Sequence, residues 1–245
     1  MTITLKLPPP VKPTLLDRVR AEPPHWADER IRLWPTEEYR VCLPFTRYRY
    51  WCDTASINVF LVIGTQQPRY AGLTWLQFLE EGPRIPDNLQ AYQKNPGYYL
   101  DTATKQPPMI FETWNGYEYY VAGDGQYRIC IARFTAFYEG RCLLHGVTVS
   151  ERHIDRELLA LWQQLKEIIG ERRILMSVEP VSRTLSRQDT AGWQLESYEV
   201  QLRVIFEGRF WPLNAAGALS LLRTLQAPRW RRWFWIRRQL QQQVG

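Results

Sequence analysis

A glycine-rich turn followed at once by a nearly continuous apolar segment is the feature that most constrains this fold. The stretch VAGDGQYRICIARF covers residues 121–134. The helix predicted to begin in this stretch continues past its end, and at 100° per residue it has two apolar arcs. One holds Tyr127, Cys130, Ile131, Phe134, Phe137 and Tyr138, and the opposite one holds Ile129, Ala132 and Ala136. A helix that is apolar on two faces packs between two layers, so we predict a buried helix from Gln126, with Gln126 and Arg133 on a narrow polar edge and Arg128 on the other.

The turn ahead of this helix has a candidate chemical role. Gly123 and Gly125 permit positive φ angles and a close backbone approach, and Asp124 is placed to cap the first amides of the helix. Free amides at a helix N-terminus, with Arg128 one turn further on, form a candidate phosphate or carboxylate site. The alternative is a tight strand-to-helix turn in which Arg128 pairs with a carboxylate.

The segments before the turn predict a strand, a short helix and a long loop. INVFLVIG at 57–64 is β-branched enough for a buried strand. LTWLQFLEEG at 73–82 has helical leucine spacing and a terminal glycine. Residues 83–108 are rich in Pro, Asn, Tyr and Gln and predict a long loop with one helical turn at most. A loop of that length in a compact domain is usually functional or mobile.

The chain after the turn predicts more strands and helices. LLHGVTVS at 143–150 indicates a strand, and Ser150 is placed to cap a helix that Gly170 ends. The apolar stripe of that helix is Ile154, Leu158, Leu161, Leu165 and Ile168. Two further strands are predicted at 174–182 and 198–206, with a polar loop between them at 183–192. A last helix is predicted at 215–225.

These elements predict an α+β fold, a small mixed sheet with flanking helices. Residues 1–24 contain six prolines and predict an extended arm with a short helical turn around Leu15 to Val19. Residues 25–227 are predicted to form a single domain, and 228–245 a basic aromatic C-terminal helix. The hydrophobic content of 45% in 245 residues is enough for a sizeable core.

The positive charge is concentrated at the C-terminal end. The formal net charge is +6, and without residues 229–245 the chain has 26 basic and 25 acidic side chains. Arginines and tryptophans alternate there, and the residues predicted to bind nucleic acid are Arg229, Trp230, Arg231, Arg232, Trp235, Arg237 and Arg238. Arginines bind phosphates and exposed aromatic rings stack on bases, which favours DNA or RNA as a partner. Two alternatives are a basic amphipathic helix on an anionic membrane surface, and a helix that docks its aromatic rings on the body.

The cysteine pattern and the N-terminus indicate a cytoplasmic location. The four cysteines form no C-x-x-C pair, which is typical of reduced thiols, and neither an export signal nor a membrane-spanning segment is predicted. Zinc bound by Cys42, Cys52, His145 and His153 is an alternative that depends on the fold.

The hairpin segments, the turn and the following strand resemble the core of the ParB/sulfiredoxin superfamily. The resemblance covers roughly residues 107–150, within a ParB/sulfiredoxin-like core expected at about 107–170, and PPMIFE ahead of the first strand fits it. The layout of the chain is similar to that of plasmid oncogenic-suppression and fertility-inhibition proteins. It implies a nucleotide phosphate site at Gly123, Gly125, Gln126, Tyr127 and Arg128. Gly125 and Gln126 stand where partition proteins usually carry arginines, and Gln126 replaces the reactive cysteine of sulfiredoxins.

Catalysis by a ParB-like nuclease or NTPase would need carboxylates that hold Mg²⁺. The candidate catalytic residues are Asp124, Arg128, Glu112 and Glu118. MIFETW and YEYYVA predict a hairpin closed by the two-residue turn Asn115-Gly116, and its unknown register decides whether the two glutamates converge. No other catalytic motif is present to support an enzyme.

Two functions of different classes follow from the sequence. The first is a nucleic-acid-binding ParB-like protein of a mobile element, with a nucleotide and Mg²⁺ as expected cofactors, that acts as a DNase in the inhibition of DNA transfer. The second is a non-catalytic module that blocks or scaffolds a protein partner. Eleven tryptophans support the second function, because aromatic residues and arginine are enriched in interface cores.

Overall fold

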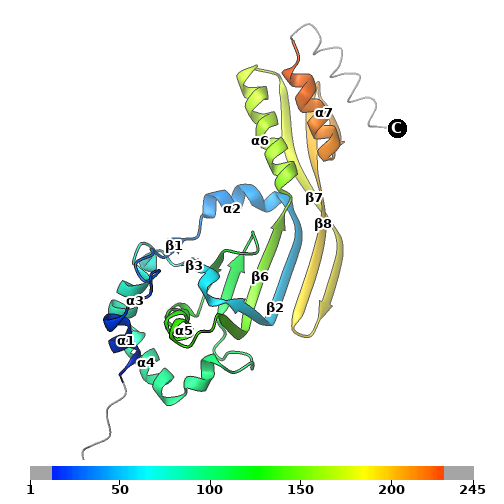
Figure 1. Cartoon of the computed structure of the whole chain (residues 1–245). Coiled ribbons are helices and arrows are strands. Elements are labelled where there is room, and N and C mark those ends of the chain that lie inside the picture. Colours follow the sequence, from blue (N-terminus) through cyan, green and yellow to red (C-terminus); the bar gives the residue numbers. More distant parts are fainter. Residues whose placement is uncertain (1–12, 229–245) are drawn as a thin grey trace, which may run out of the picture. The chain divides into compact units, whose positions relative to one another are not determined.

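The computed structural model describes residues 13–228 (Figure 1). The predicted α+β class is confirmed, because these residues form seven α-helices and a mixed sheet. Contacts divide them into two compact units, which we call unit 1 and unit 2. Unit 1 comprises 13–34, 54–111 and 119–147, and unit 2 comprises 35–53, 112–118 and 148–228. Each unit thus draws on three separate stretches of the chain.

The strands of unit 1 carry the parallel part of the sheet. Its strand order is β1-β3-β5-β4-β6. β1 (Arg32–Leu33) and β5 (Tyr119–Val121) both pair in parallel with β3 (Val62–Thr65). β4 (Ile110–Thr113) and β6 (Leu143–Ile154) follow, and these two strands also supply residues to unit 2.

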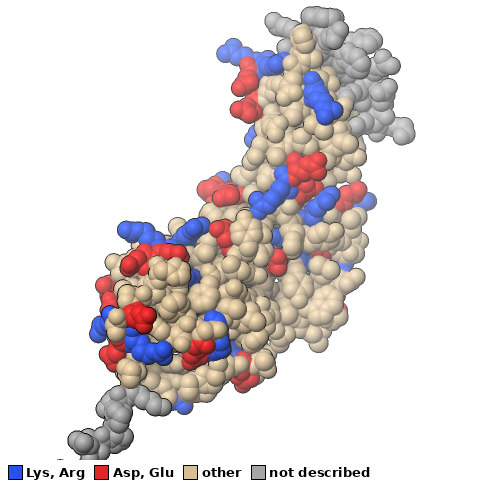
Figure 2. Space-filling model, in the orientation of Figure 1, with Lys and Arg blue, Asp and Glu red and all other residues tan. Residues whose placement is uncertain are grey.

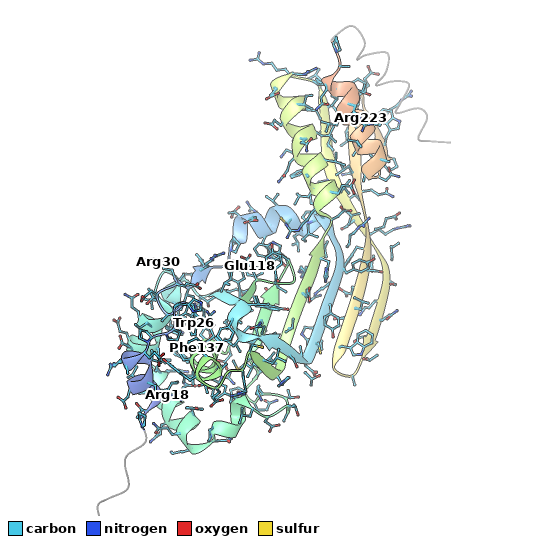
Figure 3. The ribbon with its side chains drawn as sticks, in the orientation of Figure 1. Arg18, Trp26, Arg30, Glu118, Phe137 and Arg223 are labelled. Atoms are coloured by element: carbon cyan, nitrogen blue, oxygen red, sulfur yellow. The ribbon has the colours of Figure 1, made fainter. Side chains whose placement is uncertain are left out.

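Helix α5 (Gln126–Tyr138) is the central element of unit 1. Every residue from Ile129 to Ala136 is buried, which confirms the predicted two-sided packing. Three shorter helices contact it, namely α1 (Leu15–Ala21), α3 (Trp75–Glu81) and α4 (Ile85–Lys94). Trp26 lies against Phe134 at 4.7 Å between ring centroids and against Phe137 at 6.2 Å (Figure 3). These aromatic contacts hold the large-residue face of α5 in the core.

Arg133 is buried in the middle of this core, with 2% of its surface exposed. Its guanidinium carbon lies 4.5 Å from the ring centroid of Trp26 and 4.2 Å from that of Trp75, and Nη1 donates to the Val62 carbonyl. Burial lowers the Arg133 pKa to about 10. The polar edge predicted for Gln126 and Arg133 is therefore enclosed in the core and shielded from water. Two indole rings and a strand carbonyl contact the cation in place of water.

Unit 2 is an antiparallel sheet covered on one face by helices. The strand order is β6-β2-β8-β7, with β9 (Arg209–Leu213) also paired to β8. β2 spans Thr46–Asn58, and the long pair is β7 (Met176–Thr190) and β8 (Trp193–Phe206). The helices are α2 (Thr36–Cys42), α6 (Arg156–Glu171) and α7 (Ala215–Gln226). Of the predicted stripe, Leu158, Leu161, Leu165 and Ile168 are buried with Leu202 and Val204 of β8 in one core cluster. Ile154 is the last residue of β6 instead and is only partly buried.

Several sequence-based boundaries before residue 123 are wrong. Residues 57–64 are the end of β2, a 3-10 turn (Val59–Leu61) and β3, since Asn58 caps the turn and interrupts the strand. Residues 83–108 contain α4 and the 3-10 turn Pro96–Tyr99, rather than a long loop. The hairpin turn spans 114–118 rather than two residues, because the Asn115 side chain accepts the amides of Tyr117 and Glu118.

Two boundaries in unit 2 also differ from the predictions. Helix α6 is capped by the side chain of Asp155, which accepts the Leu158 amide, and not by Ser150, which lies within β6. The polar segment 183–192 is not a loop, because β7 and β8 stay paired as far as Thr190 and Trp193. Helix α3 and its end at Gly82, α7 and the turn of helix at Leu15–Val19 are confirmed. Much of the predicted arm and the basic C-terminal helix lie outside the described residues.

Charged side chains of both signs are interspersed on the surface. On the face that Figure 2 shows, Lys and Arg lie among Asp and Glu over both units. This distribution agrees with the nearly balanced charge of the chain without its C-terminal segment. Between residues 13 and 228, no helix has the length and apolar character needed to cross a membrane.

Candidate binding pocket in unit 1

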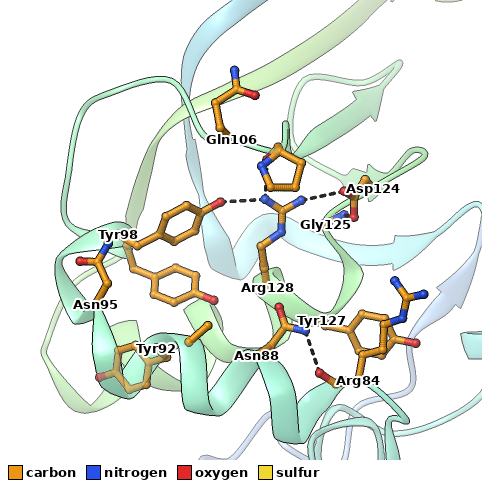
Figure 4. A pocket seen from close by; sticks show the side chains of 13 residues that line it. Arg84, Asn88, Tyr92, Asn95, Tyr98, Gln106, Asp124, Gly125, Tyr127 and Arg128 are labelled. Carbon is orange, nitrogen blue, oxygen red and sulfur yellow. Dashed lines mark hydrogen bonds and ion pairs between the residues drawn. The ribbon is translucent and has the colours of Figure 1, made fainter.

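A pocket of about 390 Å³ lies where α4 and the segment 95–108 meet the start of α5 (Figure 4). Its lining is rich in tyrosines and side-chain amides, with two arginines and one carboxylate. The lining residues are Arg84, Asn88, Ala91, Tyr92, Asn95, Tyr98, Tyr99, Gln106, Pro107, Asp124, Gly125, Tyr127 and Arg128. All of them belong to unit 1.

Helix α4 forms one wall because its pocket-lining residues recur at helical spacing. Arg84, Asn88 and Tyr92 are four residues apart and therefore lie on one side of the helix. Ile85, one residue after Arg84, is buried and fixes the helix against the unit. The Asn88 side-chain amide donates to the Arg84 carbonyl at 2.7 Å, and the same oxygen also accepts the Asn88 backbone amide at 3.1 Å.

Arg128 holds the opposite wall in place. Its Nη1 donates to the Tyr98 hydroxyl at 2.7 Å and to the Pro107 carbonyl, and Nη2 donates to the Pro108 carbonyl at 3.0 Å. Nη2 also pairs with Asp124 at 3.0 Å, and only 11% of the Arg128 side chain is exposed. The guanidinium thus ties the segment 98–108 to α5, so its first role is to position the pocket wall.

A close backbone contact fixes the same segment from behind. The Lys105 amide donates to the Gly146 carbonyl at 2.7 Å. A Cβ atom on Gly146 would lie 1.9 Å from the Ala103 carbonyl oxygen, and the φ of Gly146 is +68°. Both facts require glycine, because any side chain would push the segment off β6. Lys105 itself is buried, and burial lowers its pKa while its Nζ donates to the Asp101 carbonyl at 2.6 Å.

The glycine turn has the predicted backbone but a different hydrogen-bond pattern. Gly123 and Gly125 have φ values of +82° and +119°, which confirms their positive φ. Asp124 accepts from the Gly125 amide and pairs with Arg128, and no side chain caps α5. The predicted cap is therefore wrong, and the predicted alternative, a tight turn in which Arg128 pairs with a carboxylate, is the observed geometry. Because no side chain caps α5, its first amides are left beside the pocket residues Asp124 and Gly125.

The tyrosines of the pocket are held by one another and by the core. Tyr99 makes edge contacts with Tyr92 and Tyr98 at 5.7 and 5.0 Å between centroids, and its burial raises its pKa. Tyr127 stacks on Phe78 at 5.3 Å, and its hydroxyl lies 2.5 Å from that of Tyr70. Burial, followed by this hydrogen bond, raises the Tyr70 pKa to about 12. Tyr92, Tyr98, Tyr99 and Tyr127 thus line the pocket with aromatic rings that neighbouring side chains hold in place.

The structure brings together only part of the predicted site. Gly125, Tyr127, Asp124 and Arg128 line the pocket, whereas the side chain of Gln126 is buried and donates to the Gly123 carbonyl at 3.0 Å. The predicted nucleic-acid-binding residues at 229–238 lie outside the described residues.

The two predicted catalytic glutamates belong to unit 2, unlike Asp124 and Arg128. Glu118 accepts from the Asn115 side-chain amide at 2.9 Å. Burial raises the pKa of Tyr39, and the charge of Glu112 adds to this rise. Each therefore already has a polar neighbour within its own unit.

A metal site does not form among the side chains that the structure places. Residues 13–228 contain no group of three or more His, Cys, Asp or Glu residues that could hold an ion. Of the four residues considered for zinc, His145 Nδ1 lies 2.7 Å from the Ser56 hydroxyl and His153 Nε2 lies 3.0 Å from Glu151. Cys42 is buried beside Glu38 and Arg156, and burial raises its pKa.

The residues of α4 and the 3-10 turn were missed by the sequence analysis. Arg84, Asn88, Tyr92 and Asn95 fall in the segment predicted as a long loop. Their spacing of four, four and three residues was the available signal, since it places polar and aromatic side chains on one helical face. Three prolines within 83–96 obscured it.

No family model, curated protein or solved structure matches this chain. The resemblance to the ParB/sulfiredoxin superfamily therefore stays a prediction.

Proposed function

We propose that the pocket of unit 1 binds a nucleotide, either free or as the end of a nucleic-acid strand. The observation that carries this proposal is the combination, around about 390 Å³, of tyrosine rings, side-chain amides and an exposed arginine at the start of a helix. Pockets for small ligands have volumes of about 300 to 1,000 Å³ and contain a few convergent polar groups.

The base is the part of the ligand that the tyrosines and amides would recognise. Tyr92 and Tyr98 are half-buried and present ring surface to the pocket, and bases stack on such rings. Asn88, Asn95 and Gln106 each offer both a donor and an acceptor, which matches the mixed edges of a base. A simple anion would use only the donors among these groups, and neither the amide oxygens nor the ring faces.

The phosphate would lie toward Arg84 and the first turn of α5. Arg84 is exposed at the rim, and the amides at the N-terminus of α5 have no side-chain cap. Helix N-termini bind phosphate through such amides and through the helix dipole. Arg128 would act mainly by holding the wall, because its guanidinium already has four partners.

The sequence-based hypothesis of a nucleic-acid-binding protein of a mobile element fits this site. The resemblance implies phosphate binding at 123–128, and the pocket adjoins the same turn. Binding of DNA or RNA through the arginines of 229–238, and Mg²⁺-dependent cleavage that inhibits DNA transfer, remain parts of the proposal that need their own assays.

A binding titration with matched tyrosine variants tests the proposal. Mononucleotides and short 5′-phosphorylated single strands are titrated into the full chain, into Tyr92→Ala and Arg84→Gln, and into Tyr117→Ala as a control. Tyr117 is 57% exposed and lies in unit 2. We expect the two pocket variants to weaken binding by at least about tenfold, the effect of losing one stacked base or one phosphate contact. The control should bind as the wild type does.

The two arms distinguish the two ligand sources. Mononucleotide binding that depends on Tyr92 and Arg84 supports a free nucleotide, and binding of strands alone supports a strand end. Binding that is undetectable in both arms, or equal in all variants, contradicts the proposal. The same samples, incubated with Mg²⁺ and labelled DNA, show whether cleavage accompanies binding.

A further inference from the structure

The sheet of unit 2 has one face on which no helix of that unit packs. On β8, side chains alternate between faces, and Val200, Leu202, Val204 and Phe206 point to the side where α6 and α7 pack. Every second residue of β8 from Trp193 to Ile205 points to the opposite side of the sheet, and none of these residues is buried. We call this second surface the open face.

The open face is three strands wide at each end of β8 and two strands wide between them. At one end, Trp193 and Leu195 pair with Cys52 and Tyr50 of β2. At the other end, Ile205 pairs with Phe210 of β9. β7 runs beside β8 throughout, from Thr190 to Met176.

Large apolar side chains lie at both ends of this face. Tyr48 of β2 is 48% exposed and Phe210 of β9 is 72% exposed. Val181 of β7, which pairs with Gln201, is 40% exposed. Exposed apolar groups that are contiguous with half-buried ones, such as Trp193 and Leu195, mark an interaction surface.

The middle of the open face carries balanced charges. Arg183 pairs with Glu199, and Arg203 pairs with Glu179, both at 2.7 Å. At the Tyr48 end, the acid Glu151 accompanies His153. The face thus lacks the excess of positive charge that a phosphate backbone needs, and its composition of aromatic residues and paired arginines is that of a protein interface.

The size of the face fits a dimer interface. The 14 residues of β8 extend about 45 Å at about 3.3 Å per residue. Three strands at about 4.8 Å spacing over 193–197 and 202–206, and two strands over 198–201, then give roughly 600 Å² per copy, or about 1,200 Å² for a pair. This area is at the lower end of the range of about 1,200 to 2,000 Å² buried in stable protein complexes.

We propose that a second copy of this chain packs on the open face, so that two sheets stack face to face. In a two-fold pair, the same surface of each copy forms the interface. Each copy offers two acids and two arginines along the middle strip, so the strips are complementary to each other in charge. Association then buries the apolar side chains at the two ends of the face, around Trp193 and Phe210. The removal of this apolar surface from water provides the driving force for association.

The oligomeric state of the full chain tests this inference. Sedimentation velocity is measured from about 1 to about 100 μM protomer, because a dimer depends on protomer concentration. The variants are Trp193→Glu and Phe210→Glu, and the control is Leu175→Glu. Leu175 is 92% exposed and lies before β7, outside the open face. Circular dichroism melts check that every variant folds.

A dimer for the wild type and the control, and a monomer for the two folded open-face variants, would support the proposal. A monomeric wild type over the whole range would overturn it, as would a dimer that persists in both variants. Single-stranded DNA binding by a monomeric wild type, lost in Trp193→Glu, would overturn it in favour of a nucleic-acid platform. None of these outcomes depends on the pocket of unit 1.

Discussion

The pocket of unit 1 and the open face of unit 2 use similar side chains on surfaces of different shape. In the pocket, tyrosines converge from a helix, a 3-10 turn and the start of α5, and the Asp124–Arg128 pair closes one wall. On the open face, aromatic rings stand on neighbouring strands and Arg–Glu pairs lie between them. We therefore assign ligands of different size to the two surfaces: the proposed nucleotide to the converging side chains of the pocket, and the proposed second copy of the chain to the extended open face.

Removing the buried cation of unit 1 should have the largest effect. In Arg133→Ala, the space between Trp26 and Trp75 is left empty and the Val62 carbonyl loses its donor. We expect the free energy of unfolding to fall by about 3–5 kcal/mol, as for other large buried truncations. Urea denaturation measures it.

Arg133→Met separates volume from charge at this position. It keeps most of the side-chain volume and removes a charge whose burial is costly, so it should lose clearly less stability than Arg133→Ala. Equal losses in the two variants would mean that the cation, and not the filled space, holds α5 in the core.

The covered and open faces of β8 and β9 should respond differently to truncation. Leu202 is fully buried under the helices, whereas Phe210 is 72% exposed. Leu202→Ala should cost about 2–4 kcal/mol of unfolding free energy, and Phe210→Ala less than about 1 kcal/mol for the monomer. Thermal melts at low protein concentration provide the comparison. A large loss in Phe210→Ala under those conditions would mean that this ring is buried within its own chain.

Loss of the wall contact at Arg128 should have an intermediate effect confined to unit 1. Arg128→Ala removes the N–H groups that donate to the Tyr98 hydroxyl and to the Pro107 and Pro108 carbonyls. We expect a loss of about 2–3 kcal/mol, typical of hydrogen bonds to a charged group, and faster proteolysis within 100–108. Arg128→Lys should restore only part of it, since one ammonium cannot reproduce the fork. Unchanged cleavage in both variants would show that this segment is held by other contacts.

The smallest effect concerns the tyrosine pair behind the pocket. The Tyr70 pKa is raised from 10.0 to about 12, first by burial and then by the bond to Tyr127. The stabilisation linked to this shift is present below pH 10 and is lost as the pH rises through about 12. In Tyr127→Phe, the Tyr70 pKa should fall but stay above 10.0, because burial remains. Ultraviolet titration of tyrosinate detects the change, and an unaltered curve would contradict the role of Tyr127.

The predictable part of the fold was the part that local pattern determines. The burial of α5 follows from its two apolar arcs, and the positive φ of Gly123 and Gly125 follows from their residue type. The α+β class followed from the same patterns. In contrast, the extension of β7 to Thr190 depends on pairing with β8, and every residue from 181 to 190 is exposed. No apolar alternation could therefore reveal that strand.

The candidate site was only partly predictable for a similar reason. The turn at 123–128 was found because glycines and a helix start are local signals. The partners of Arg128 were not found, since Tyr98 and the Pro107 and Pro108 carbonyls meet it only through tertiary contacts. The cap expected from Asp124 failed because Arg128, four residues later, takes its carboxylate.

Hydrogen exchange with and without a saturating mononucleotide tests the central claim, that the pocket of unit 1 is the nucleotide site. We expect slower amide exchange in 84–108 and 123–128, with little change in 176–206, and loss of this protection in Tyr92→Ala. Protection that is missing from 84–108 and 123–128, or that appears only in 176–206, would contradict it.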